Sequence, residues 1–144
     1  MKHLSLKANG LTNASVDEFF ASVSSLEELV LNKNFLRGVR GIGAFITANP
    51  GLRVIKLRHC YLGSEHMALI GEGLHGTQSL RELKLAYNEI EELTDLKEGL
   101  RANKSLTLLD LGNNRIYDEA LEEFAEVLQF TTALEELRVH GNPV

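Results

Sequence analysis

The segment LRELKLAYNEI, residues 80–90, decides the fold of this chain. Aliphatic residues stand at its first, fourth and sixth positions, and an asparagine and a further aliphatic residue close it. Leu83 and Leu85 alternate with the polar Lys84, which is the period of a strand that buries one face. Asn88 follows three residues after Leu85, where the chain has to turn. The segment therefore predicts a short strand with one buried face and a polar turn after it.

The same phrase occurs six times in register. Its copies begin at Met1, Leu26, Leu52, Leu80, Leu106 and Leu134. The copies follow one another at intervals of about 25 to 28 residues, a period typical of stacked repeat units. One such unit is too small to bury its own apolar face, so neighbouring units have to stack and share a continuous core. We therefore predict a repeat solenoid.

The polar position of the phrase is expected to form a buried ladder through the stack. It is occupied by Asn9, Asn34, Cys60, Asn88, Asn114 and Asn142. An asparagine side chain has both donors and acceptors, so stacked asparagines can satisfy backbone groups at every level. Cys60 fits the same small site as a weak donor, and we expect it to satisfy fewer of those groups.

The stretches between the phrases have the period of a helix. Each contains an apolar pair at positions i and i+4, which lie on one helix face. The pairs are Val16 and Phe20, Ile42 and Ile46, Ile70 and Leu74, Leu96 and Leu100, and Phe124 and Leu128. Ser15 and Glu18 predict a capping box at the first helix, and Asp118 predicts the N-cap of the last. The helix around Ile42 has the weakest propensity because glycines lie in and before it.

This spacing resembles the leucine-rich repeat superfamily, and the repeat length resembles its ribonuclease-inhibitor-like subfamily. The resemblance implies an α/β fold: a right-handed horseshoe arc with six parallel strands on the concave face and about five helices on the convex face. Residues 1–144 would form a single domain, either a fragment of a longer protein or an uncapped array. The family includes protein inhibitors, innate-immune sensors, actin-capping proteins and GTPase-activating proteins, so the fold alone does not define the function.

Composition restricts the class of protein. The chain has a formal net charge of −5, one cysteine and no tryptophan. No apolar run approaches the length of a membrane span, and the N-terminus does not resemble a signal peptide. A single cysteine cannot form an internal disulfide, so we expect an intracellular, cytoplasmic protein. Two sequons, at Asn13 and Asn103, point the other way, but such short motifs arise often by chance.

The two ends of the array allow two interpretations. The first phrase starts at the first residue and the last ends at Val144, so the apolar rows are uncovered at both ends. Solenoids normally need polar caps. Either the chain is an excised piece, or a homodimer covers the ends by pairing their terminal strands.

The predicted binding surface is the concave face, where the residues between the aliphatics point. The candidate binding residues are Lys33, Lys56, Arg58, His59, Lys84, Tyr87, Asp110, Arg138 and His140. Basic residues outnumber acidic ones in these columns although the whole chain is acidic. This segregation favours a protein partner with an acidic surface, because opposite charge raises the encounter rate. Glutamates at the edge of the columns oppose this interpretation, as does the frequent use of Lys at solvent-facing strand positions.

Other functions have less support in the sequence. The acidic balance and the lack of further aromatic residues among these bases disfavour nucleic acid. The five histidines have no metal-like spacing, and no Ser or Cys has a His and an acid at a convincing offset, so we predict no metal, no cofactor and no catalytic residue. One alternative is a GTPase-activating module that uses the loop arginines Arg37 and Arg40. Another is a structural scaffold segment. The main prediction is a non-catalytic protein–protein interaction module without membrane contact.

Overall fold

The structure, a computed structural model that describes residues 1–143, is a single six-stranded sheet covered on one side by five helices. The strands are β1 (His3–Ser5), β2 (Glu28–Val30), β3 (Val54–Lys56), β4 (Glu82–Lys84), β5 (Leu108–Asp110) and β6 (Glu136–Arg138). The helices are α1 (Asn13–Ser22), α2 (Ile42–Ala48), α3 (Glu65–Gly76), α4 (Thr94–Ala102) and α5 (Asp118–Leu128). Strand and helix alternate, as predicted.

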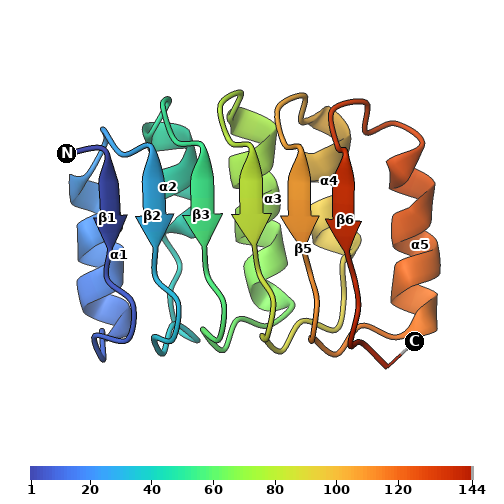
Figure 1. Ribbon diagram of the computed structural model, residues 1–144, viewed down its shortest axis with the longest axis horizontal. Helices are drawn as coiled ribbons and strands as arrows, with labels where there is room; N and C mark the ends of the chain where they lie inside the picture. The colour runs from blue at the N-terminus through green and yellow to red at the C-terminus, as the bar shows by residue number, and fades with distance from the viewer. Residues whose placement is uncertain (144) are drawn as a thin grey trace.

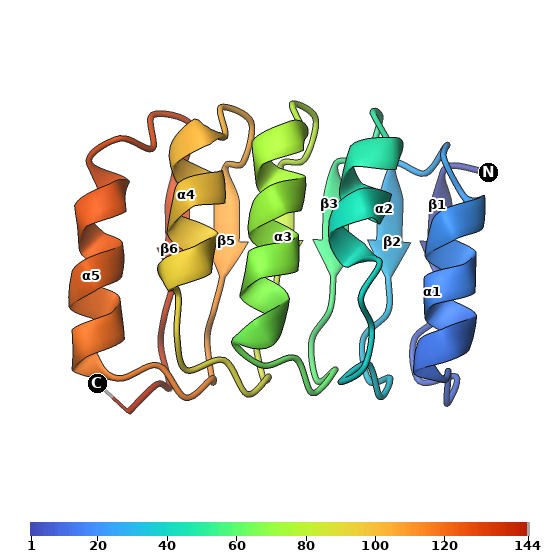
Figure 2. The same ribbon diagram turned by 180° about the vertical axis from the view of Figure 1, so that it is seen from behind.

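All strands are parallel and lie in chain order from β1 to β6 (Figure 1). The helices cover the opposite side (Figure 2). We call the uncovered side of the sheet the open face; it is the concave side of the predicted arc. The loops that follow the strands run along the lower edge in Figure 1, and we call this the strand-end edge. The predicted α/β solenoid is confirmed. The last position of the sixth phrase, Val144, lies outside the described residues.

Strand register follows from the repeated phrase. The second aliphatic residue of each phrase pairs with its equivalent in the next strand, for example Leu29 with Ile55 and Ile55 with Leu83. Parallel pairing continues beyond the short strands, since Leu57 N donates to Lys84 O at 2.8 Å. Because the side-chain period of a strand is two residues, a slip of one residue would turn every leucine outward. Burial of the leucines therefore fixes the register.

The core lies between the strand leucines and the inner faces of the helices. In α3, the predicted i, i+4 pair Ile70 and Leu74 is fully buried. Phe20 of α1 and Phe45 of α2 pack with ring centroids 4.6 Å apart. Each fully buried large aliphatic side chain contributes about 1.5–3 kcal/mol relative to an exposed one. In α5, Leu128 is only partly buried against this core.

Both predicted helix caps were wrong. Thr12, not Ser15, is the N-cap of α1: its side chain accepts a hydrogen bond from Ser15 N at 3.3 Å, and the helix already begins at Asn13. At α5 the N-cap is Tyr117, and Asp118 is the first helical residue. As an acidic residue of the first turn, Asp118 lies at the positive end of the helix dipole.

The central helices pack with their backbones in contact. A Cβ at Gly99 of α4 would overlap the backbone of Gly71 in α3, and a Cβ at Gly43 of α2 would overlap the backbone of Leu69. The glycine in α2 that lowers its helix propensity therefore permits this close approach. The predicted helix around Ile42 is confirmed as α2, because packing outweighs local propensity.

Asparagine side chains form a hydrogen-bonded ladder through the stack, although Asn9 in the first repeat is exposed and its Nδ2 donates to Lys7 O at 3.2 Å. Asn88 Nδ2 donates to the carbonyl oxygens of Leu57 and Leu85 at 2.8 and 2.9 Å. Its Oδ1 accepts from the backbone N–H groups of Cys60 and Leu62 at 2.9 and 3.0 Å. One side chain thus satisfies four backbone groups in two neighbouring repeats. Equivalent bonds to carbonyl oxygens are made by Asn34, Asn114 and Asn142.

Cys60 occupies the same site and makes fewer bonds, as predicted. Its Sγ donates to Leu31 O at 3.2 Å. The N–H of Leu36, which an asparagine Oδ1 would accept, instead donates to the carbonyl oxygen of Cys60 at 3.0 Å. Tyr61, the next residue, has a left-handed backbone with φ of 61°. The main chain thus supplies the acceptor that the thiol lacks.

A second buried ladder, missed in the sequence, lies at the helix ends. Asn49 Oδ1 accepts from Leu26 N at 3.1 Å, and its Nδ2 donates to Phe45 O at 2.8 Å. Asn103 occupies the same place after α4, and its Nδ2 donates to Leu74 O at 2.8 Å. Each asparagine stands three residues before the first leucine of a phrase, which is the sequence signal that identifies it. Asn103, the first residue of the second sequon, is therefore a buried structural residue.

Candidate functional site on the open face and the strand-end edge

Four of the predicted binding residues form one row on the open face. Lys56, Lys84, Asp110 and Arg138 are the last residues of β3 to β6 and pair in register with one another. The residues that follow, including Arg58, His59 and Tyr87, lie just beyond the strands. The structure therefore gathers the predicted set along the lower half of the open face and its strand-end edge.

The basic residues of this row are ion-paired within the sheet. The pairs are Lys56 with Glu28 at 2.8 Å, Lys84 with Glu82 at 3.0 Å, and Arg138 with Glu136 at 2.6 Å. The hydrogen bond from Lys56 holds the pKa of the Glu28 carboxyl below its usual value. These glutamates make the open face less positive than its outward-facing residues predict from the sequence.

Arg58 makes the ion pair that spans the sheet. Its Nη2 lies 3.1 Å from Asp110 Oδ2, so the side chain reaches from the β3 repeat across the β4 repeat to β5. Asp110 is fully buried, and its Oδ1 accepts a hydrogen bond from Gly112 N at 3.1 Å. The small Ala86, also fully buried, leaves room for the crossing. Asp110 therefore lies on the predicted face, and its carboxylate contacts Arg58 and Gly112.

The residue before the ladder position has a left-handed backbone in every repeat. The residues and their φ values are Ala8 at 56°, Lys33 at 60°, His59 at 55°, Tyr87 at 59°, Asn113 at 53° and Gly141 at 71°. In residues other than glycine and asparagine this conformation costs about 1–2 kcal/mol each. Such strain tends to be retained where it serves function.

His59 and Tyr87 form a stacked pair at this edge. Their ring centroids are 4.4 Å apart with an interplanar angle of 14°, and Tyr87 is 46% exposed. Arg58 Cζ lies 6.0 Å from the Tyr87 centroid, at the limit of a cation–π contact. Tyr87, one of the predicted binding residues, thus lies against His59 and beside Arg58.

A second exposed column runs along the strand-end edge and was missed in the sequence. It is the position directly after the ladder residue, and it holds Phe35, Tyr61, Glu89 and Arg115 in consecutive repeats. The Phe35 and Tyr61 rings pack at 4.9 Å between centroids. Large aromatic residues at a position that should face solvent were the signal that could have identified it.

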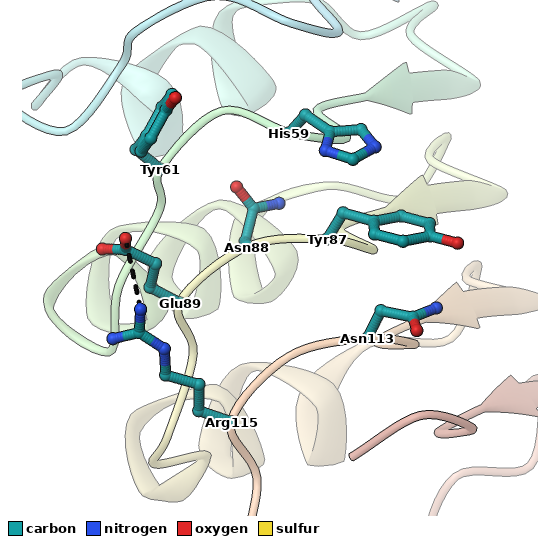
Figure 3. Close-up of a pocket in the computed structure, with 7 residues that line it drawn as sticks. All are labelled: His59, Tyr61, Tyr87, Asn88, Glu89, Asn113 and Arg115. Atoms are coloured by element: carbon teal, nitrogen blue, oxygen red, sulfur yellow. Dashed lines mark ion pairs between the residues drawn. The ribbon is translucent and has the colours of Figure 1, made fainter.

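A shallow groove of about 330 Å³ separates the two columns, and its size is within the range of small binding sites. It is lined by His59, Tyr61, Tyr87, Asn88, Glu89, Asn113 and Arg115 (Figure 3). We call it the strand-end groove. Glu89 lies between two arginines: Arg37 Nη2 is 2.7 Å from Oε2, and Arg115 Nη2 is 3.5 Å from Oε1.

The remaining predicted residues lie around this region. Lys33 is exposed in the same left-handed column as His59 and Tyr87, one repeat before His59. The imidazole of His140 lies against Gly112 near Asp110. Of the two arginines in the GTPase-activating alternative, Arg37 is held by Glu89, and Arg40 Nη1 is 3.4 Å from Val39 O.

One buried ionisable group lies away from the open face. His66 of α3 is fully buried, and its Nδ1 accepts a hydrogen bond from Gly63 N at 3.1 Å. Its Nε2 has no partner within residues 1–143. Burial lowers the pKa of His66, and the nearby Glu65 carboxylate offsets part of this effect. The neutral imidazole with its proton on Nε2 fits this hydrogen-bond pattern.

Two negative findings apply to residues 1–143. No group of three or more His, Cys, Asp or Glu side chains is placed to hold a metal ion. No helix there is both long enough and apolar enough to cross a bilayer.

Comparison with known proteins agrees with the geometry. The Leucine Rich repeat family pattern matches residues 102–125, which include most of α5 and the strand before it. The structure of the leiomodin-1 actin-binding site 2 superposes with a TM-score of 0.72 at 17% identity, covering 97% of this chain and 70% of that one. The tropomodulin C-terminal domain of Caenorhabditis elegans gives 0.67 at 10% identity, covering 96% and 73%.

Sequence identities this low support a common fold and nothing about function. Stacked units of strand, ladder residue and helix define a leucine-rich repeat solenoid, and both superpositions extend over nearly the whole chain. The chain has the leucine-rich repeat fold, and the Leucine Rich repeat pattern matches residues 102–125 of it. Its place in the ribonuclease-inhibitor-like subfamily stays a prediction.

Proposed function

We propose that this chain is a non-catalytic protein-binding module that receives its partner on the open face of the sheet. The observation that carries the proposal is the fixed arrangement of Arg58 beside the stacked His59–Tyr87 pair. Asp110 holds the guanidinium, and the left-handed backbone holds both rings. Arg and Tyr are enriched among residues that dominate binding energy. Side chains that are ordered before binding lose less entropy when a partner arrives.

The partner in this proposal has an acidic surface. Lys56 and Lys84 retain 31% and 23% of their side-chain exposure although each is paired with a glutamate. A partner carboxylate can exchange with those glutamates at the rim of the interface. Such exchange contributes more to the association rate and to partner selection than to affinity. We therefore expect binding that weakens as salt concentration rises.

Actin is the first partner to test. One structure with the same fold is named for an actin-binding site, although at 17% identity this likeness supports the fold only. Co-sedimentation with actin filaments and a pull-down with monomeric actin would test it directly. A negative result with both forms would remove actin and leave the proposal open to other acidic protein surfaces.

The decisive experiment reverses charge on the open face. In a pull-down followed by mass spectrometry, the double variant Lys56→Glu plus Lys84→Glu should lose the proteins that the wild type retains. The matched control is Arg101→Glu plus Lys104→Glu, which makes the same charge change at exposed positions on the helix side. For a purified partner, we expect an affinity loss of about tenfold or more. An unchanged set of partners in the open-face variant would refute the proposal.

A further inference from the structure

Exposed aromatic side chains are concentrated on the strand-end edge. Phe35, Tyr61 and Tyr87 are 53%, 47% and 46% exposed and come from three consecutive repeats. Two of the three stand in left-handed backbone, which disfavours residues of this size. The Phe35 and Tyr61 rings are in contact, and exposed apolar side chains gathered in this way commonly mark a binding surface.

The strand-end groove runs across the repeats rather than along a strand. Its inner wall is the column of His59, Tyr87 and Asn113, and its outer wall is the column of Tyr61, Glu89 and Arg115 (Figure 3). It spans three repeats, and neighbouring parallel strands are about 4.8 Å apart, so its length is about 10 Å. An extended peptide rises about 3.3 Å per residue, so about three residues fill the groove.

An exposed arginine stands at one end of the groove. Arg115 is 56% exposed there, and its contacts of 3.5 Å to Glu89 and 3.9 Å to Glu91 leave part of the guanidinium free to bind. Arg37 takes the closer contact with Glu89 at 2.7 Å. Lys33 lies one repeat beyond the other end, outside the lining, and has no ion-pair partner within residues 1–143. The Arg115 end of the groove is thus complementary to a carboxylate, and its middle is complementary to an apolar side chain.

We propose that the strand-end groove binds a short extended peptide segment of the partner in which an aromatic or aliphatic residue stands next to Asp or Glu. This inference rests on the proposed function and adds a second, adjoining contact to it. The apolar side chain lies between the Tyr61 ring and the His59–Tyr87 stack. The acidic side chain accepts from Arg115, or from Lys33 when the peptide extends by one repeat.

A basic peptide fits the groove less well. Glu89 is the carboxylate in the lining, and it already faces two arginines, so an incoming cation would have to displace one of them. Glu89 instead acts as a positioning residue, because it holds Arg115 at the mouth of the groove. Its replacement by glutamine should therefore weaken peptide binding without removing any direct contact.

The test is selection from a displayed library of random dodecapeptides on the immobilised full chain, in parallel with three variants. The first variant, Tyr61→Asn plus Tyr87→Asn, removes both rings, and asparagine tolerates the left-handed backbone. The second is Arg115→Gln. The control is Tyr117→Asn, which removes a 56% exposed aromatic residue that does not line the groove. Circular dichroism and urea midpoints establish that each variant is folded.

The expected result is enrichment of peptides with an acidic residue within about two positions of a Phe, Tyr, Leu or Ile. Synthesised peptides of this class should bind about tenfold more weakly to each groove variant and equally well to the control. Enrichment of basic sequences, enrichment unaffected by the groove variants, or no enrichment above that of the ring-deleted variant would each overturn the inference.

The open-face variant Lys56→Glu plus Lys84→Glu separates this inference from the proposed function. Neither lysine lines the groove, so peptide binding should persist in that variant. If a purified partner requires the two lysines while no peptide is selected, the proposed function stands and the groove assignment falls. If acidic peptides are selected while protein partners ignore the lysines, the proposed function falls.

Discussion

The backbone N–H of Leu36 donates to the main-chain carbonyl of Cys60, whereas the equivalent N–H of Leu62 in the next repeat donates to the side chain of Asn88. The ladder therefore continues through a cysteine because the chain changes conformation at Tyr61. The thiol is enclosed in the process. Burial raises the pKa of Cys60 to about 11.

Cys60 should be inert in the native protein. Only the thiolate reacts with disulfide reagents, and at pH 8 a thiol with this pKa is almost wholly protonated as well as buried. We expect no reaction with Ellman's reagent in native buffer and one thiol per chain in urea. The labelling rate at intermediate urea should follow the unfolding rate. Rapid labelling of the native chain would show that the ladder opens at this level.

Stability should fall in mild acid because of His66. The unfolded chain binds a proton on this histidine near its ordinary pKa of 6.5, whereas burial lowers the folded pKa. Between these two values the unfolded state binds more protons, so the free energy of unfolding decreases as pH falls below about 6.5. The slope for one proton approaches about 1.4 kcal/mol per pH unit.

Urea denaturation at a series of pH values would measure this slope. The control is His66→Asn, whose side-chain oxygen can still accept from Gly63 N but does not titrate. The half-buried Glu27 and Glu28 have lowered pKa values, so their contributions are lost only below about pH 4.5, outside this window. An unchanged acid slope in the variant would contradict the assignment to His66.

The ion pair between Arg58 and Asp110 should be energetically coupled. Asp110→Asn keeps an acceptor for Gly112 N but leaves the guanidinium of Arg58 without its carboxylate. Because Arg58 is 38% exposed, water compensates in part, and we expect a loss of about 1 kcal/mol.

A double-mutant cycle with Arg58→Leu would measure the coupling by urea denaturation. The two single losses should sum to more than the loss of the double variant, because each single change also breaks the shared contact. Additive losses within about 0.3 kcal/mol would mean that the pair contributes nothing beyond its separate members.

Alanine at Gly99 should destabilise the stack of helices. The added Cβ would overlap the backbone of Gly71, and backbone cannot move aside as a side-chain tip can. We expect a net loss of about 1–2 kcal/mol, since overpacking costs about 1–3 kcal/mol and alanine recovers up to about 1 in helix propensity. Gly51→Ala is the matched control, because its nearest neighbour would be Glu27 Cγ at 3.9 Å. Equal urea midpoints for the two variants would refute the clash.

The fold could be predicted because its cause is repeated in the sequence. Leu29, Ile55 and Leu83 occupy one position in successive phrases, and a single rule about burial explains them all. The caps could not be predicted equally well, because Thr12 and Ser15 both suit an N-cap and the choice depends on where α1 meets the preceding turn. The local sequence does not distinguish these two N-caps, whereas the folded structure uses Thr12.

The candidate site could be predicted only in part. Strand alternation predicts the column that holds Lys56 and Lys84, and the glutamates at its edge oppose its positive charge. Which carboxylate meets which lysine depends on side-chain geometry that the sequence pattern does not contain. The contact of Arg58 with Asp110 joins residues 52 positions apart and depends on side-chain reach across a repeat. Phe35 and Tyr61 occupy a repeat position of variable chemistry, directly after the ladder residue, so the groove beside Tyr61 is defined only when the repeats are stacked.

The asparagine ladder also bears on how such a chain can change its length. Each rung bonds only to the unit before it and to its own unit, so duplicating or excising one complete unit would rejoin equivalent rungs without altering any other. An insertion that is not a whole number of repeat units would interrupt the ladder of hydrogen bonds at the junction. Growth in whole-unit steps would lengthen the surface offered to a binding protein while leaving the interior chemistry untouched.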